Sequence, residues 1–232
     1  SGGHGYQTGE IMKKLEPILL KENPDLVLVY GDTNSTLAGA LSAAKLHFPI
    51  SHVESGLRSF NRLMPEEINR IITDNISSLL YCPSKVSREN LIKEGIVEGI
   101  NVVGDVMYDI FKKFENKFII DGLHDKEYCL LTMHRAENTT GSALRKRMQQ
   151  ISNIDLKIIF PVHPRAKKVM SQNSITLPKN IELVDPVGWI EMMGLVKKSK
   201  FVITDSGGLQ KESMWHKKKC FTLRNETEWV ET

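Results

Sequence analysis

Short apolar runs rich in β-branched residues recur along this chain, and each is followed by a polar turn and a helix-like segment. The first run is DLVLVY at 25–30, with Asn23-Pro24 before it and Gly31-Asp32 after it. A continuous apolar run of this length between turn residues is typical of a strand buried in a parallel sheet. Strands that alternate with helices predict βαβ units. The alternation therefore restricts the chain to an α/β fold with parallel sheets.

The same pattern predicts where each element lies. We expect strands at 25–30, 48–53, 79–82, 99–103, 128–133, 156–161, 181–184, 201–204 and 220–223. We expect helices at 33–46, 65–77, 84–94, 108–118, 141–151, 165–171, 189–197 and 208–216. The segment DGLHD at 121–125 separates two such series. It predicts a first domain over 1–120 and a second domain over 121–232.

Composition argues against several classes of protein. The chain has 232 residues, of which 41% are hydrophobic, and a net charge of +3, which is too small to indicate a nucleic-acid or membrane partner. It has no run of the ~18 continuous apolar residues that a membrane helix needs, and its first residues do not resemble a signal peptide. Cys82, Cys129 and Cys220 are scattered, which is typical of reduced thiols. We therefore expect a globular cytoplasmic protein.

Polar side chains follow five of the expected strands. In an open parallel sheet, ligands bind beyond the carboxyl ends of the strands. A single polar turn is explained by helix capping, whereas five at one sheet edge predict a ligand site. The five turns are GDTNST (31–36), ESGLR (54–58), HRAEN (134–138), HPR (163–165) and DSGG (205–208).

The segment TDSGGLQKE at 204–212 has the features of a phosphate site. Gly207 and Gly208 allow close approach of the backbone, and the following helix presents free N–H groups and its positive dipole end. Ser206 adds a donor, and Glu212 could accept hydrogen bonds from ribose hydroxyls. The alternative is a plain Ser N-cap followed by a glycine turn, and the spacing alone does not decide between the two.

Three carboxylates are candidates for general acid and base chemistry. Asp32 and Glu54 follow consecutive strands, and Glu66 begins the next helix. The alternatives are a helix cap for Asp32 and a first-turn dipole partner for Glu66. In the second half, His134 and His163 are each followed closely by an arginine, which favours an anion-binding cluster over isolated structural histidines. No pair of histidines has metal-ligand spacing, so we expect no metal.

The ordered motifs of this chain resemble those of the non-hydrolysing UDP-N-acetylglucosamine 2-epimerases. The resemblance implies two Rossmann-like domains of glycosyltransferase-B type with the ligand in a cleft between them. It also implies a reaction without metal or NAD cofactor, and a homodimer. The matching motifs are VYGDTNST (29–36), HVESGLRSFN (52–61), MPEEINR (64–70), GDVMYD (104–109), MHRAEN (133–138), PVHPR (161–165), TDSGGLQKE (204–212) and LRNETEW (223–229).

The resemblance also implies roles for individual residues. UDP would be eliminated across C1–C2 of the sugar, and its return with reprotonation of C2 on the other face would give the manno epimer. The implied acid/base carboxylates are Asp32, Glu54 and Glu66, and His134 would assist the departing UDP. The implied UDP clamp is Ser206, Gly207, Gly208 and Glu212. We add Arg58, Arg135, Glu137 and His163 as further expected contacts to the UDP-sugar.

The chain departs from the family pattern in two ways. It begins after the leading strand and its glycine/arginine turn and stops before the closing helices, so it looks truncated and its first domain incomplete. Residues 58–61 and Glu228-Trp229 look more like the branch that acts on UDP-2,3-diacetamido-glucuronate. Three alternatives therefore stay open: the same reaction on that sugar, a glycosyltransferase on this fold, or an inactive UDP-binding remnant.

Overall fold

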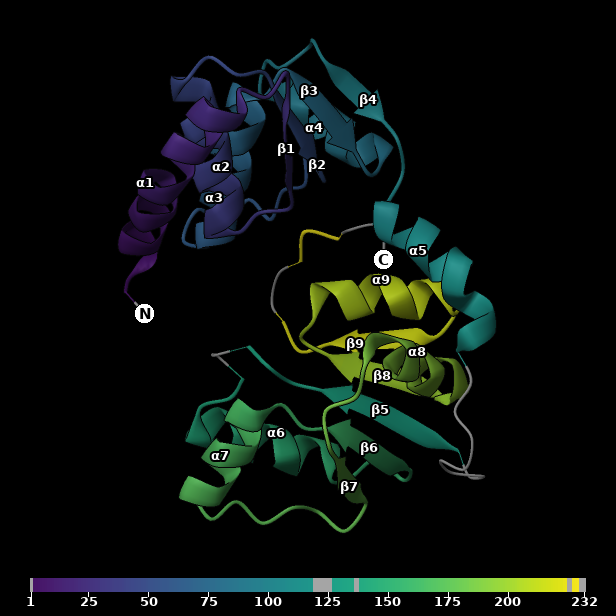
Figure 1. Cartoon of the computed structure of the whole chain (residues 1–232). Helices are drawn as coiled ribbons and strands as arrows, with labels where there is room; N and C mark the ends of the chain where they lie inside the picture. Colours follow the sequence, from purple (N-terminus) through teal and green to yellow (C-terminus); the bar gives the residue numbers. More distant parts are fainter. Residues whose placement is uncertain (1, 119–126, 136–137, 225–226, 230–232) are drawn as a thin grey trace. The chain divides into compact units, whose positions relative to one another are not determined.

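The computed structural model describes residues 2–118, 127–135, 138–224 and 227–229. The chain forms two compact units, Ser1–Asp109 and Ile110–Thr232 (Figure 1). Each unit has its own sheet of parallel strands, which confirms the predicted α/β fold with two parallel sheets. The boundary predicted after residue 120 lies at 119–126, outside the described residues.

The first unit holds a four-stranded sheet in the order β1-β2-β3-β4. Its apolar core joins Val29 and Ile50 of neighbouring strands to Ala40 and Ala43 of the second helix. Its strands are β1 (Val27–Tyr30), β2 (Ile50–Val53), β3 (Leu79–Cys82) and β4 (Ile100–Val102). Its helices are α1 (His4–Glu22), α2 (Asn34–Lys45), α3 (Pro65–Ile76) and α4 (Lys85–Lys93).

Helix α1 was not predicted from the sequence. It contains Pro17, a residue that normally argues against a helix interior, and Leu19 is its buried residue. The helix packs against α2, which flanks the sheet (Figure 1). It ends at Asn23, whose left-handed φ of 42° lets its amide donate to the Leu19 carbonyl. The Asn-Pro pair that marks the start of the first strand therefore also ends this helix.

The second unit holds a five-stranded sheet in the order β7-β6-β5-β8-β9. One face packs on α6 and α7 through residues such as Leu144 and Met170, and the other packs on α8 and α9 through Met193 and Leu209. Its strands are β5 (Tyr128–Thr132), β6 (Lys157–Pro161), β7 (Ile181–Val184), β8 (Phe201–Thr204) and β9 (Lys219–Thr222). Its helices are α6 (Gly141–Ile151), α7 (Pro164–Gln172), α8 (Trp189–Lys198) and α9 (Gly207–Trp215).

Helix α5 (Val106–Phe114) and the short 3-10 helix η1 (Glu115–Lys117) follow the first sheet. Phe111 and Phe118 belong to the apolar core of the second unit, beside Tyr128 and Leu130. The end of this segment is therefore part of the second unit. Among the described residues, no helix combines the length and apolar character that crossing a bilayer requires.

Candidate functional site

Two turns meet at the carboxyl edge of the first sheet, one after β1 and one after β2. The Gly31 amide donates to the Val53 carbonyl at 3.1 Å, which ties the first turn to the end of β2. A carboxylate oxygen of Glu54 lies 3.5 Å from the place that a Cβ on Gly31 would occupy. Gly31 has a φ of 65°, a conformation that glycine adopts without strain. The fold thus brings Glu54 beside the turn that carries Asp32.

Glu54 has a backbone conformation that side-chain-bearing residues rarely adopt. Its φ is 73°, and this left-handed conformation costs about 1–2 kcal/mol for a residue other than glycine. The next two amides hold it in place: Ser55 donates to the Tyr81 carbonyl, and Gly56 donates to Asp74 Oδ2, each at 3.1 Å. Strain that is fixed by its surroundings in this way is concentrated at functional sites.

Two residues of α3 fix the position of Asp32. Arg70 donates to Asp32 Oδ2 through Nε at 3.0 Å and through Nη2 at 2.9 Å. Asn69 donates to the Asp32 carbonyl at 2.8 Å. The Arg70 side chain is 2% exposed, whereas that of Asp32 is 31% exposed. The carboxylate is therefore fixed by a buried partner and still open to a ligand.

The two glutamates that open α3 have different surroundings. Glu67 is buried and accepts hydrogen bonds from the Phe60 amide at 2.9 Å and from Arg70 Nη1 at 2.5 Å. Glu66 is half-buried. Glu66 and Arg70 are four residues apart, so they share a face of the helix, and Arg70 contacts Asp32. This arrangement gives Glu67 a structural role and leaves Glu66 as the acid/base candidate.

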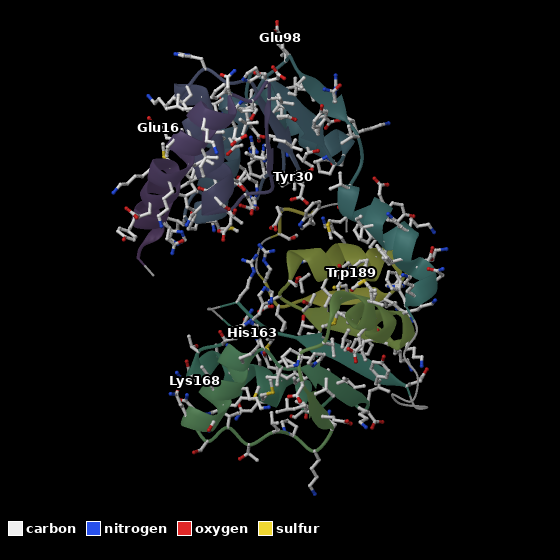
Figure 2. The ribbon with its side chains drawn as sticks, in the orientation of Figure 1. Glu16, Tyr30, Glu98, His163, Lys168 and Trp189 are labelled. Atoms are coloured by element: carbon white, nitrogen blue, oxygen red, sulfur yellow. The ribbon has the colours of Figure 1, made fainter. Side chains whose placement is uncertain are left out.

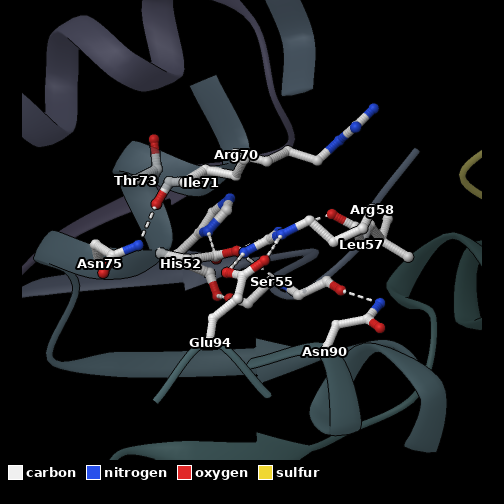
Figure 3. A network of polar contacts seen from close by, with 12 residues as sticks. His52, Ser55, Leu57, Arg58, Arg70, Ile71, Thr73, Asn75, Asn90 and Glu94 are labelled. Carbon is white, nitrogen blue, oxygen red and sulfur yellow. Dashed lines mark hydrogen bonds and ion pairs between the residues drawn. The ribbon is translucent and has the colours of Figure 1, made fainter. Parts of the chain in front are cut away.

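Arg58 lies buried beneath the turn after β2 (Figure 3). Its Nε and Nη2 donate to the two carboxylate oxygens of Glu94 at 2.7 and 2.6 Å. Its Nη1 donates to Asp74 Oδ2 and to the Leu57 carbonyl, both at 2.7 Å. The side chain has no exposed surface. Because every guanidinium nitrogen has an acceptor within the protein, this geometry gives Arg58 a structural role and does not support its expected contact with a UDP-sugar.

The second sheet has a topological switch point between β5 and β8. These neighbouring strands lead onward in opposite directions, β5 toward β6 and β8 toward β9. The turns that follow such a pair diverge and leave room for a ligand. The Oγ1 atoms of Thr132 and Thr204 are 2.6 Å apart and join the two strand ends. His134 follows one of these ends and Asp205 follows the other.

Asp205 organises the turn that carries His134. His134 Nδ1 lies 2.9 Å from Asp205 Oδ1, and the amides of His134 and Arg135 donate to the same carboxylate. Asn138 Nδ2 adds a hydrogen bond of 3.0 Å. Burial alone would raise the pKa of Asp205, but the hydrogen bonds from His134, Asn138 and the Arg135 amide outweigh burial and lower the pKa. The carboxylate is thus ionised, and Nε2 of the half-exposed His134 ring is left to face a ligand.

The amino end of α9 lies beside His134 in this unit's switch point. Ser206 is the N-cap, and its Oγ accepts the Leu209 amide at 3.3 Å. The first amides of a helix and its dipole favour a bound anion, and a side-chain cap is compatible with that role. A Cβ on Gly207 would lie 3.0 Å from Glu228 Oε1 and 3.2 Å from Trp229 Nε1. Glycine at this position therefore lets the segment 227–229 approach the helix end.

Glu212 lies about one turn further along α9. The indole Nε1 of Trp189 donates to Glu212 Oε1 at 2.6 Å. Trp189 begins α8 (Figure 2). Its ring packs edge-on against Phe118. The carboxylate that was expected to bind ribose is therefore oriented by a neighbouring helix.

The other predicted residues of this unit are placed as follows. Arg135 Nε donates to the Asp205 carbonyl at 3.1 Å, so this guanidinium stays near the switch point. His163 is exposed in the turn after β6 (Figure 2). Glu137 lies outside the described residues. Among the described residues there is no group of three or more His, Cys, Asp or Glu side chains that could hold a metal ion.

Sequence reasoning missed Asp205 as a site residue. It stands in the TDSGG motif, where an aspartate is usual for any turn between strand and helix. Its role depends on the adjacency of β5 and β8, strands that are separated by more than 60 residues. The sequence does show an Asp after one expected strand and a His after another. This pair becomes informative only when the strand order shows that the two strands are neighbours.

These features define an α/β protein with a candidate anion-binding site at the carboxyl ends of a parallel sheet. The chain belongs to the UDP-N-acetylglucosamine 2-epimerase family, because the family model matches residues 1–232. The resemblance identified from the motifs is thereby confirmed, and the family's members are isomerases.

Several known proteins are similar to this chain over its whole length. A UDP-N-acetylglucosamine 2-epimerase homolog of Methanococcus maripaludis is 52% identical over 100% of this chain and 69% of its own. The UDP-2,3-diacetamido-2,3-dideoxy-D-glucuronate 2-epimerase of Pseudomonas aeruginosa is 46% identical over 99% of this chain and 67% of its own. The crystal structure of Methanocaldococcus jannaschii UDP-GlcNAc 2-epimerase with UDP-GlcNAc and UDP superposes with a TM-score of 0.89, at 42% identity, over 100% of this chain and 69% of that one.

Proposed function

We propose that this chain acts in the conversion of UDP-GlcNAc into UDP-ManNAc, as a UDP-N-acetylglucosamine 2-epimerase that supplies precursors of cell-surface polysaccharides. The family membership supports this proposal, as does the relative that binds UDP-GlcNAc and UDP. The observation that carries it is the position of Glu54 beside the turn of Asp32. Two carboxylates at one sheet edge can remove and return a proton at the same carbon.

In the proposed reaction the bond between C1 of the sugar and the UDP oxygen breaks and the C2 proton leaves to a carboxylate. The products of this step are UDP and a glycal with a C1–C2 double bond. UDP then adds back to C1, and a proton is returned to C2 on the opposite face. The composition of the substrate is unchanged. Asp32, Glu54 and Glu66 are proposed to handle the C2 proton.

The second unit is proposed to hold and stabilise the departing UDP. The half-exposed His134 ring, oriented by Asp205, would donate to the diphosphate as negative charge develops there. The amides of Gly207 and Gly208 and the hydroxyl of Ser206 would bind the same diphosphate at the end of α9. Glu212, oriented by Trp189, would accept hydrogen bonds from the ribose. Arg135, Glu137 and His163 remain proposed contacts.

Two UDP-sugars are candidate substrates. The Pseudomonas relative, named for the diacetamido-glucuronate, is as fully matched as relatives named for UDP-GlcNAc. We keep that sugar as a second candidate substrate because of this similarity. The comparisons favour an epimerase over a glycosyltransferase on the same fold.

The test is exchange at C2 in D2O. The protein is incubated with UDP-GlcNAc or with the UDP-diacetamido-glucuronate, and the recovered sugars are analysed by NMR. Deuterium at C2 and formation of the manno epimer are expected with one of the two sugars. If neither sugar gives deuterium at C2 or a manno epimer, the proposal is contradicted. Glu54→Gln should abolish exchange. Glu98→Gln, at an exposed glutamate before β4, is the matched control and should leave exchange unchanged.

We also propose that the protein is a homodimer and acts in the cytoplasm. Light scattering on the purified protein would measure the dimer, and a monomer under assay conditions would contradict it. Fractionation of the source cells would test the location.

A further inference from the structure

His52 lies on β2 and is completely buried, and both of its ring nitrogens face acceptors. Nδ1 lies 2.7 Å from Asp74 Oδ1, and Nε2 lies 2.8 Å from the Gly31 carbonyl oxygen. A carbonyl accepts only, and an ionised carboxylate also accepts only. Both contacts are hydrogen bonds only if each ring nitrogen carries a proton. In a singly protonated ring, the lone pair of the unprotonated nitrogen would face one of these oxygens at hydrogen-bond distance, which is repulsive.

The alternative is a protonated Asp74 that donates to a neutral His52, and the other contacts of Asp74 argue against it. Asp74 Oδ2 accepts from Arg58 Nη1 at 2.7 Å and from the Gly56 amide at 3.1 Å. A buried guanidinium at this distance favours the ionised carboxylate. Burial would lower the pKa of Arg58, but its hydrogen bonds to Glu94 and the charge of Asp74 outweigh burial and raise the pKa.

The charges of this buried network balance when His52 is doubly protonated. The cations are then His52 and Arg58, and the anions are Asp74 and Glu94, so the four charges sum to zero. A neutral His52 would leave the single charge of Arg58 to offset both Asp74 and Glu94, in a region where three of the four side chains have no exposed surface. A net charge in a buried network is unfavourable. Hydrogen-bond geometry and charge balance thus give the same protonation state.

The network makes hydrogen bonds to the chain on both sides of Glu54. His52 is two residues before Glu54, and the Gly56 amide, two residues after it, donates to Asp74. The other nitrogen of His52 holds the Gly31 carbonyl, directly before Asp32. Asp74 is therefore a common anchor for both sides of the strained residue. His52, which Figure 3 shows near Arg58 and Glu94, extends that anchor to the neighbouring turn.

We propose that His52, in its doubly protonated form, and Asp74 are positioning residues that hold Glu54 in its left-handed conformation and Asp32 beside it. This inference rests on the proposed function for its catalytic consequence, and its protonation state can be tested without it. The network touches the backbone of the two turns and not the reacting atoms. It acts through Glu54 and Asp32.

The first arm of the test is NMR of the free full chain labelled with ¹⁵N in its histidines. The chain has seven histidines. One of them, assigned to His52 through its backbone resonances, is expected to show both ring nitrogens protonated at neutral pH. That signal should disappear in His52→Gln. A His52 signal with one unprotonated nitrogen at neutral pH overturns the proposed protonation state, whatever the enzyme's activity.

The second arm is kinetics with His52→Gln and Asp74→Asn, each measured on folded protein. A displacement of a catalytic group by about 1 Å costs about 100-fold, so kcat for C2 exchange should fall by about that factor while KM for the UDP-sugar changes little. His47→Gln is the matched control and should change neither constant. A lower melting temperature with unchanged kcat would show a purely structural role and overturn the positioning proposal.

The two arms separate the possible failures. If His52→Gln does not fold, Asp74→Asn supplies the kinetic result, and if neither folds the NMR arm still decides the protonation state. If the parent protein exchanges no deuterium with either sugar, the proposed function fails. The NMR result on the free chain then still confirms or overturns the network.

Discussion

His134 Nδ1 and Asp205 Oδ1 lie 2.9 Å apart, although the two residues, which follow the neighbouring strands β5 and β8, are 71 residues apart in the sequence. The carboxylate is fully buried, and two backbone amides and Asn138 also donate to it. A histidine whose Nδ1 is fixed in this way presents Nε2 in a defined direction, as a group that donates to a departing phosphate requires. The orientation of His134 therefore depends on Asp205.

Asp205→Asn should slow the reaction more than it weakens UDP binding. The amide keeps the size of the carboxylate but would set an NH2 group against donors, so His134 would lose its fixed orientation. General acid catalysis is worth about 10²–10⁴-fold, and we expect kcat to fall about 100-fold. Isothermal titration with UDP and steady-state kinetics measure the two effects. An unchanged kcat in folded Asp205→Asn would contradict this role.

The stability of the protein should depend on Asp205 in acid. The pKa of Asp205 is lowered in the folded protein, so its contribution is complete above the unfolded carboxyl value of about 3.9 and is lost as pH falls through the folded value. Asparagine does not titrate. Urea unfolding from pH 7 to pH 2.5 should therefore show a difference between parent and Asp205→Asn that is constant near neutrality and shrinks below about pH 4. A difference that does not change with pH contradicts the shift.

Gly56→Ala should be severely destabilising. Gly56 has a φ of 76°, and a Cβ there would lie 2.2 Å from the Ser87 carbonyl oxygen on α4. Conformational strain and overpacking together should lower the free energy of unfolding by about 3 kcal/mol or more. Gly95→Ala is the control, because Gly95 has a φ of 86° with no atom within 4 Å of the added Cβ. It should cost about 1 kcal/mol. Equal losses in the two variants would contradict the proposed contact.

Much of the fold could be predicted from local pattern. The strands at 79–82, 181–184 and 201–204 and the helix at 141–151 match the structure to the residue. Each is a short apolar run or a periodic segment between clear turn residues, so local information is sufficient. Helix α1 is different because its interior Pro17 obscures the pattern and its partner is another helix.

The polar turns of the candidate site were predictable, but its contacts were not. The family motifs indicate Asp32, Glu54 and His134 as candidates, whereas the left-handed φ of Glu54 depends on contacts from α3 and β3. Arg58 is expected from its motif to contact the UDP-sugar. In the structure it is buried against Asp74 and Glu94, which lie 16 and 36 residues further along the chain. Such pairings depend on tertiary structure, which a single sequence does not display.

Trp189→Phe should weaken UDP binding while the packing around it stays intact. Phenylalanine keeps the contact with Phe118 but removes the 2.6 Å hydrogen bond to Glu212. Without this hydrogen bond the Glu212 carboxylate can leave the orientation that ribose binding requires, so Kd for UDP should rise about tenfold, or ~1.4 kcal/mol. Trp215→Phe, on the same helix as Glu212 and packed on Phe111, is the control and should leave Kd unchanged. Equal affinities for parent and Trp189→Phe would argue against ribose binding by Glu212.

His216 should make the second unit less stable in mild acid. Its ring packs on Phe111 at a centroid distance of 4.7 Å, and within the described structure its buried Nε2 has no hydrogen-bond partner. Burial, followed by the charge of Lys197, lowers the pKa of His216 from 6.5 to about 4. Between these values the unfolded chain binds a proton that the folded protein does not, so stability falls as pH drops from about 6.5 to about 4.

His216→Phe should remove this part of the pH dependence, because phenylalanine does not titrate and can pack on the same aromatic residues. Chemical denaturation of parent and variant at pH 7.5, 6, 5 and 4 measures it. At each step below about pH 6.5, the free energy of unfolding of the parent should fall more than that of the variant, since only the parent has to keep a buried imidazole neutral. Parallel curves for the two proteins over this range would show that His216 is protonated at its ordinary pH in the folded state.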